Sequence, residues 1–287
     1  MDKEIGMITS GMPEYPAALK EIKDFPKVLF YRGNIQLLNR RCAAVVGSRK
    51  TTQYGRTTAG MIGRRLAERD IVIVSGMAKG IDTCAHRGAL DVSGNTIAVF
   101  ACGMDICYPK ENQELKKEIE EKGLAVSEYP PGTAPEKYYF PQRNRIISGL
   151  SELTVVVQAG SSSGALITAE LAAEQGREVF AVPGNIDSRY NLGNNKLIKE
   201  GAAPVTCIED ICEAMGIGGI SRTDAEKVLG ETEMQIFRLL ENNGEMTVDE
   251  LCRIMGKAPA YISSIVTVME IKGVVFSALG KIFIAKA

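Results

Sequence analysis

Short apolar runs and segments of helical period alternate through the middle of the chain, and this alternation most constrains the fold. The runs are rich in β-branched residues, and most of them end in glycine, as buried strands do before a turn. They predict strands at residues 42–48, 71–76, 96–103, 124–129, 153–160 and 178–184. The segments between them predict helices at roughly 55–69, 82–90, 111–122, 142–150 and 164–175. Strand followed by helix, repeated, predicts a Rossmann-like α/β fold, a doubly wound and mostly parallel sheet. Ligands in such sheets bind outside the carboxyl ends of the strands.

The composition changes near residue 216, and this change predicts a second domain. Residues 216–230 begin with a stretch rich in glycine and polar residues, which predicts a linker. Helical patterns and a β-rich tail with a turn at Leu279-Gly280 follow, so residues 231–287 are predicted to form a small winged-helix domain. Residues 1–40 are predicted to be a short lead-in, and residues 41–215 the Rossmann-like domain.

Charge, cysteine content and missing motifs exclude several classes of protein. Because 34 Lys and Arg balance 35 Asp and Glu, binding of a polyanion requires local clusters of charge. Seven cysteines without a CxxC pair, and one histidine, favour neither a disulfide framework nor a zinc site. The N-terminus lacks a signal-peptide pattern and no run reaches 18 apolar residues, so we expect a cytoplasmic protein without membrane contact. Neither GxGxxG nor GxxxxGK[ST] is found, so no cofactor and no metal are expected.

Basic and small polar residues collect in the loops that follow the predicted strands. The stretch FPQRNRIISG (140–149) places two arginines and an asparagine just before the apolar run at 153–160. Since the carboxyl ends of parallel strands share one edge of a sheet, a single anion accounts for these residues together. The candidate binding residues are Gly47, Ser48, Arg49, Lys79, Phe140, Arg143, Asn144, Arg145, Ser161, Ser162, Gly164 and Lys196.

Each group of candidates can be interpreted in two ways, as a nucleic-acid contact or as an ordinary structural feature. A guanidinium holds a phosphate with two parallel donors, and rings such as those at 138–140 stack on bases for about 1–3 kcal/mol each. The turn at 159–168 leads into a helix N-terminus, a cradle for an oxyanion. The alternatives are an N-capped turn and aromatic rings that face the core. Adjacent helical residues diverge by about 100°, so one of Arg143 and Arg145 can instead brace the loop against a strand end.

Over roughly residues 15–210 the chain resembles the DNA-processing protein A family (DprA, also called Smf). The motifs that carry the resemblance are VVGSR (45–49), SGMAKGIDTCAHRGAL (75–90), FPQRNRIISGLS (140–151), GSSSGALITAELA (160–172) and VPGNI (182–186). The resemblance implies a cytoplasmic, non-enzymatic protein that binds single-stranded DNA in a basic pocket and loads RecA onto it. Recombination and natural transformation are the implied setting. It also implies a homodimer through the Rossmann-like domain, for which the candidate surface is 195–211. Arg49 of the GSR motif is the first implied DNA contact, followed by Arg143, Asn144 and Arg145.

The chain departs from the family's pattern at both ends. Its first 40 residues are too few for the helical SAM-like domain that some relatives carry. Residues 226–287 hold seven Lys and Arg against eight Asp and Glu, and the expected recognition helix is almost free of cations. Because a winged helix docks on duplex DNA through Lys and Arg, this domain suits protein contacts or capping of the main domain better.

Two other classes of protein stay open. A Rossmann-like nucleotide-processing enzyme, similar to the lysine decarboxylase-like phosphoribohydrolases, would use Glu170 on the helix after the glycine-rich turn. That family's turn reads PGGxGT, whereas this chain has AGSSSGA. A winged-helix transcription factor is disfavoured by the acidic tail. His86, the single histidine, has either a structural or a functional role.

Overall fold

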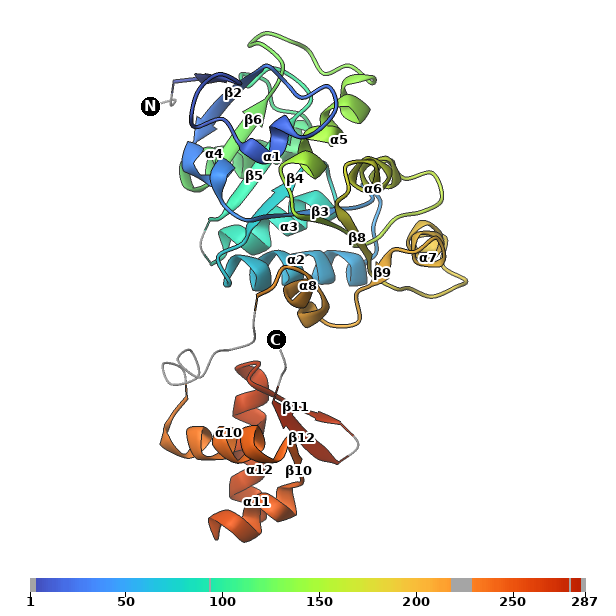
Figure 1. Ribbon diagram of the computed structural model, residues 1–287. Coiled ribbons are helices and arrows are strands. Elements are labelled where there is room, and N and C mark those ends of the chain that lie inside the picture. Colours follow the sequence, from blue (N-terminus) through green and yellow to red (C-terminus); the bar gives the residue numbers. More distant parts are fainter. Residues whose placement is uncertain (1–3, 93, 218–228, 279, 285–287) are drawn as a thin grey trace. The chain divides into compact units, whose positions relative to one another are not determined.

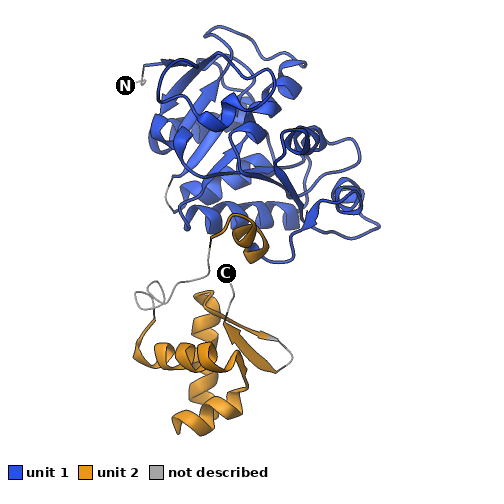
Figure 2. Ribbon diagram, viewed as in Figure 1, with its two compact units in different colours: residues 1–208 blue, residues 209–287 orange. Residues whose placement is uncertain are grey.

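A nine-stranded sheet forms the centre of the N-terminal part of the chain (Figure 1). The computed structural model describes residues 4–92, 94–217, 229–278 and 280–284. They form two compact units, residues 1–208 and 209–287, which are treated separately (Figure 2). The predicted linker falls largely on residues 218–228, which lie outside the described residues.

The strand order in the first unit is β1-β2-β6-β5-β4-β3-β7-β8-β9. Strands from β6 to β9 along this order are parallel, and β1 and β2 are antiparallel additions at one edge. The predicted Rossmann-like α/β fold is therefore confirmed. The strands span Gly6–Thr9 (β1), Val28–Gly33 (β2), Cys42–Val46 (β3), Val72–Ser75 (β4), Thr96–Phe100 (β5), Leu124–Ser127 (β6), Leu153–Val156 (β7), Glu178–Ala181 (β8) and Ala203–Pro204 (β9).

Helices cover both faces of this sheet (Figure 1). On β5, Ile97 and Val99 pack in one core with α1, α5 and α6, while Ala98 and Phe100 pack in another with α3 and α4. Alternate residues of a strand point to opposite faces, so the continuous apolar runs fill both cores. The helices of this unit are Ala17–Lys20 (α1), Gln53–Ala67 (α2), Ile81–Leu90 (α3), Gln113–Lys122 (α4), Tyr139–Gly149 (α5), Gly164–Glu174 (α6) and Leu192–Lys199 (α7), with 3-10 turns at Ile35–Asn39 (η1) and Lys110–Asn112 (η2). The next helix, Ile208–Ala214 (α8), belongs almost wholly to the second unit.

The predicted lead-in is part of this sheet and its core. Strand β2 pairs with β6, and Leu19, Leu29 and Leu37 are buried against α5 and the central strands. The sequence prediction did not include these elements, of which β1 is only four residues long and α1 a single turn.

The second unit has its own core, built from three helices and a three-stranded antiparallel sheet of order β10-β12-β11. These are the elements predicted for a winged helix, and the assignment of that fold stays a prediction. Within its bounds α12 contains no Lys or Arg. Of the predicted turn, Leu279 lies outside the described residues. The elements are Glu231–Asn243 (α10), Glu245–Met246 (β10), Val248–Met255 (α11), Pro259–Ile271 (α12), Val275–Ala278 (β11) and Lys281–Ile284 (β12).

Two kinds of feature are absent from the described part of the chain. None of the helices there is long and apolar enough to cross a membrane. No group of His, Cys, Asp or Glu side chains among these residues could hold a metal ion.

Candidate nucleic-acid interface

A cavity of about 630 Å³ lies at the carboxyl ends of the central strands. The chain runs from β3 outward through β4 and β5 to β6, and then returns to place β7 on the other side of β3. The cavity is therefore at the topological switch point, where doubly wound sheets bind their ligands. It lies between the β3–α2 loop, the β4–α3 loop, helix α5 and the β7–α6 loop. The predicted residues that line it are Gly47, Ser48, Arg49, Phe140, Arg143, Asn144, Ser162 and Gly164.

Gln158 fixes the shape of the β3–α2 loop. Its buried side-chain oxygen accepts hydrogen bonds from the backbone N–H of Thr52 (2.8 Å) and the hydroxyl of Thr51 (2.6 Å). Its own carbonyl accepts from the Ser48 N–H at 2.7 Å. These hydrogen bonds restrict the backbone conformation of the β3–α2 loop. Arg49 therefore projects from a loop whose backbone is held in place.

The rim of the cavity is basic. Arg49, Lys50 and Lys137 line it and are exposed, and none of them has an ion pair within the described part of the chain. The guanidinium of Arg49 lies 5.1 Å from the centre of the Phe140 ring, within the range of a cation–π interaction. The sequence prediction missed both lysines, although Lys50 directly follows the GSR motif.

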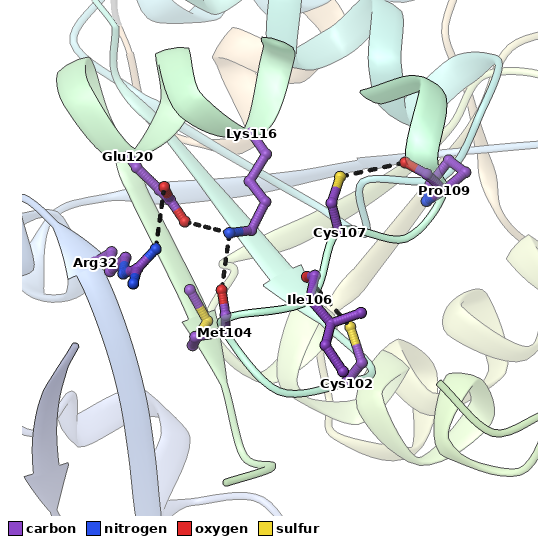
Figure 3. Close-up of polar contacts among 8 residues, drawn as sticks. All are labelled: Arg32, Cys102, Met104, Ile106, Cys107, Pro109, Lys116 and Glu120. Atoms are coloured by element: carbon purple, nitrogen blue, oxygen red, sulfur yellow. Dashed lines mark hydrogen bonds and ion pairs between the residues drawn. The ribbon is translucent and has the colours of Figure 1, made fainter. Parts of the chain in front are cut away.

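Tyr108 adds a second ring to this wall, and it was not predicted. It lines the cavity 5.4 Å from Phe140, ring centre to ring centre. The loop that follows β5 and leads to Tyr108 is fixed by the buried side chain of Lys116. Lys116 donates to the Met104 carbonyl (2.8 Å) and forms an ion pair with Glu120 (2.6 Å), as Figure 3 shows. No sequence motif marks this loop, and only the fold brings it to the cavity.

Helix α6 begins at the opposite wall. Gly164 and Ala165 of its first turn line the cavity, and Ser163 caps the helix by accepting from the Ala165 N–H (3.4 Å). The N-capped turn is therefore confirmed, and the oxyanion cradle stays a prediction, because a capped helix start still presents its positive dipole end to the cavity. Ser161 lies in the same loop but does not line the cavity.

Arg143 lies under the cavity rather than at its rim. It is only 4% exposed, and its Nη1 donates to the Gly76 carbonyl (2.7 Å) and to the Val99 carbonyl. It therefore connects the ends of β4 and β5. A Cβ at Gly76 would lie 2.6 Å from this guanidinium, so the close approach requires glycine. Burial lowers the pKa of Arg143 to about 10, and it stays charged at neutral pH.

Asp82 is a buried acidic residue beneath the cavity. Its buried carboxylate accepts from the backbone N–H groups of Gly76 (3.2 Å) and Ala78 (3.3 Å). Burial raises the pKa of this carboxyl, and the Arg143 charge and the backbone donors act against that rise. The pair shapes the β4–α3 loop, and the sequence prediction did not include Asp82.

The remaining predicted cations lie outside the cavity lining. Arg145 forms a two-point ion pair with Glu128 at 2.8 Å. Lys79 pairs with Glu111 at 2.6 Å. Lys196, on α7, pairs with Glu200 at 3.5 Å. Each of these three cations is held by a carboxylate from another helical turn or another element. The spacing of the basic residues in the sequence does not reveal these partners.

Two residues of the alternative interpretations are also placed. Glu170 is exposed on α6 and does not line the cavity. His86 is fully buried, its Nδ1 lies 2.7 Å from the Thr96 hydroxyl, and burial lowers its pKa to about 3. A neutral imidazole within the core supports a structural role for His86.

The fold and the cavity define a Rossmann-like protein with a cation-rimmed, partly aromatic pocket at its topological switch point. Residues 6–216 match the model of the family described as DNA recombination-mediator protein A. The chain belongs to that family.

Curated relatives and solved structures agree with this assignment. The chain is 42% identical over 224 residues to the DNA processing protein DprA of Bacillus subtilis (strain 168), covering 78% of this chain and 75% of that one. It is 48% identical over 197 residues to DprA of Streptococcus pneumoniae, covering 69% and 70%. The X-ray structure of S. pneumoniae DprA is similar with a TM-score of 0.71 at 44% identity, covering 74% of each chain. A structure of the Helicobacter pylori protein, described as giving insight into its single-stranded DNA binding mode, is similar with a TM-score of 0.68 at 30% identity, covering 75% of this chain and 96% of that one.

Proposed function

We propose that the chain binds single-stranded DNA in the switch-point cavity and acts in DNA recombination. The observation that carries the proposal is the rim, where Arg49, Lys50 and Lys137 have no carboxylate partners in the described residues and Arg49 lies over the Phe140 ring. Cations beside exposed rings are the combination that single-strand-binding sites use. The single-stranded DNA binding of the H. pylori relative supports the same ligand.

Different walls of the cavity bind different parts of a nucleotide. Arg49 and the lysines hold phosphate oxygens, and the first turn of α6 offers backbone N–H donors to the same charge. Phe140 and Tyr108 present rings on which a base stacks. A duplex keeps the faces of its bases stacked on each other, so this site favours a single strand.

Loading of RecA and homodimerisation form the finer part of the proposal. The dimer surface proposed from the sequence, 195–211, includes most of α7 and the edge strand β9, which is two residues long. An edge strand presents unpaired backbone groups that can pair across a two-fold axis. Light scattering at micromolar concentration should give twice the chain mass of 31.0 kDa, and a monomer there contradicts the dimer.

The function is tested by comparing single-stranded and duplex DNA of equal length and sequence. Fluorescence anisotropy should show tighter binding of the single strand, with a linear fall of log K against log salt. Equal affinity for the two forms would remove the role of base stacking. No binding of either form at low salt would overturn the proposal.

A further inference from the structure

The loop between β8 and α7 carries a second pair of an aromatic residue and an arginine. Arg189 is exposed, and its Nη2 donates to the Tyr190 hydroxyl at 3.2 Å. Its guanidinium carbon lies 5.1 Å from the centre of the Tyr190 ring. Within the described ranges Arg189 has no carboxylate partner. Neither residue lines the switch-point cavity, and no motif in the sequence singled them out.

Gln158 ties this loop to the cavity. The same side chain that accepts from Thr52 donates through its Nε2 to the Asn191 oxygen at 2.9 Å. Thr52 is two residues from Lys50, and Asn191 directly follows Tyr190. The bridge therefore brings the Arg189–Tyr190 pair close to the lysine at the rim.

Backbone packing places the pair beside the cavity as well. A Cβ at Gly160, a cavity residue, would lie 3.0 Å from the Arg189 carbonyl oxygen. The Gly193 N–H donates to the Ala159 carbonyl at 2.8 Å, which fixes the far end of the loop to the β7–α6 turn. The hydrogen bond from Arg189, followed by the charges of Arg189 and Lys50, lowers the pKa of Tyr190, as expected for neighbours.

We propose that Arg189 and Tyr190 form a second nucleotide-binding position, which takes the DNA strand as it leaves the cavity past Lys50. This inference rests on the proposed function. Tyr190 offers a ring for a base, and Arg189 holds that ring through its hydroxyl and reaches a phosphate with its remaining donors. The position adds to the affinity for strands long enough to reach it, and leaves shorter strands unaffected.

The test uses the full chain and a series of oligo(dT) of about 4 to 16 nucleotides, the range of site sizes of single-strand-binding folds. We expect wild type and Tyr190→Ala to bind the shortest strands equally. Above a threshold length, Tyr190→Ala should bind about 5- to 150-fold more weakly than wild type, the loss of one stacked base. Arg189→Ala should reduce the salt slope by about 0.7 for the longer strands alone.

The second unit offers a matched control. There, Lys257 lies 5.9 Å from the ring centre of exposed Tyr261, the same pairing of a cation with a ring. Tyr261→Ala should leave the affinity unchanged at every length. The chain has no tryptophan, so Tyr190→Trp supplies a single reporter that keeps an aromatic surface. Its fluorescence should be quenched by long strands and unchanged by short ones.

The outcomes separate this inference from the function on which it rests. If Arg49→Ala weakens binding while Tyr190→Ala and Arg189→Ala match wild type at all lengths, the function stands and the second position is wrong. If these two variants alter the mass seen by light scattering but not the affinity, the pair is a protein contact and the inference is wrong. Absence of DNA binding by wild type overturns both.

Discussion

The guanidinium of Arg49 stacks on the ring of Phe140, 5.1 Å from its centre. The two residues come from the β3–α2 loop and from helix α5, and three strands, β4, β5 and β6, lie between them along the chain. A cation–π contact orients the guanidinium without neutralising it, so its charge stays available at the rim of the cavity. A carboxylate partner at the same place would have neutralised that charge, as Glu111 does for Lys79 and Glu200 for Lys196.

Arg49→Ala should weaken binding of single-stranded DNA of any sequence about equally. Because one phosphate contact is lost, the slope of log K against log salt should become shallower by about 0.7. Anisotropy titrations at several salt concentrations measure both quantities. Arg64→Ala is the control, because Arg64 is exposed on α2 and paired with Glu68 at 3.0 Å. An unchanged slope in folded Arg49→Ala would contradict the contact.

Arg143→Gln should destabilise the domain by roughly 1–3 kcal/mol for each buried carbonyl that loses its donor. The reason is that the Gly76 and Val99 carbonyls lose their donor and that the Asp82 carboxyl loses the favourable charge of Arg143. Urea unfolding monitored by circular dichroism measures the loss.

The double variant Asp82→Asn/Arg143→Gln provides the control for this prediction. Removing both charges should cost less than the sum of the two single changes, since neither partner is left uncompensated. Simple additivity of the two losses would show that the charges act independently.

Arg145→Ala should lower stability without changing the salt dependence of DNA binding. Its two-point pair with Glu128 is partly buried, with side-chain exposures of 17% and 27%, so we expect a loss of roughly 1–3 kcal/mol. Glu128→Ala should lose a similar amount. A shallower salt slope in Arg145→Ala would instead support the DNA contact proposed from the sequence.

A fragment of residues 1–217 should fold and keep single-strand binding, since the cavity lies wholly within it. A fragment of residues 41–217 should not fold cooperatively. It lacks β2, which pairs with β6, and exposes the surface that Leu19, Leu29 and Leu37 cover. Thermal unfolding and anisotropy on the two fragments check this. Wild-type stability of the shorter fragment would contradict the role of the first 40 residues.

His86 should make stability depend on pH below about 6.5. Burial lowers its pKa to about 3, so the unfolded chain takes up a proton that the folded chain does not bind. Stability is therefore lost as the pH falls from 6.5 towards 3, by up to about 1.4 kcal/mol per unit. Urea unfolding at pH 7, 6 and 5 should show this slope in wild type and a smaller one in His86→Gln. Parallel curves for the two proteins would rule the linkage out.

Local patterns were enough to predict the order of the central elements. An apolar run such as 96–100 has to be covered on both faces wherever it lies in the fold, so its burial can be predicted from its own residues. The GSR motif, the FPQRNR stretch and the Gly/Ser turn also follow strand ends by position alone. Their meeting at one edge follows from the parallel sheet, which the same patterns predict.

The role of each charged side chain was decided by the tertiary structure. Arg143 and Arg145 are two residues apart, yet one is buried against Gly76 and Val99 and the other pairs with Glu128. Lys50 and Lys137 stay unpaired among the described residues, while Lys79 and Lys196 meet carboxylates. The sequence determines which side chains are charged and which strand end they follow. Whether a charge remains free for DNA depends on neighbours that the fold brings together, because Coulomb attraction acts over a few ångströms in space and not along the chain.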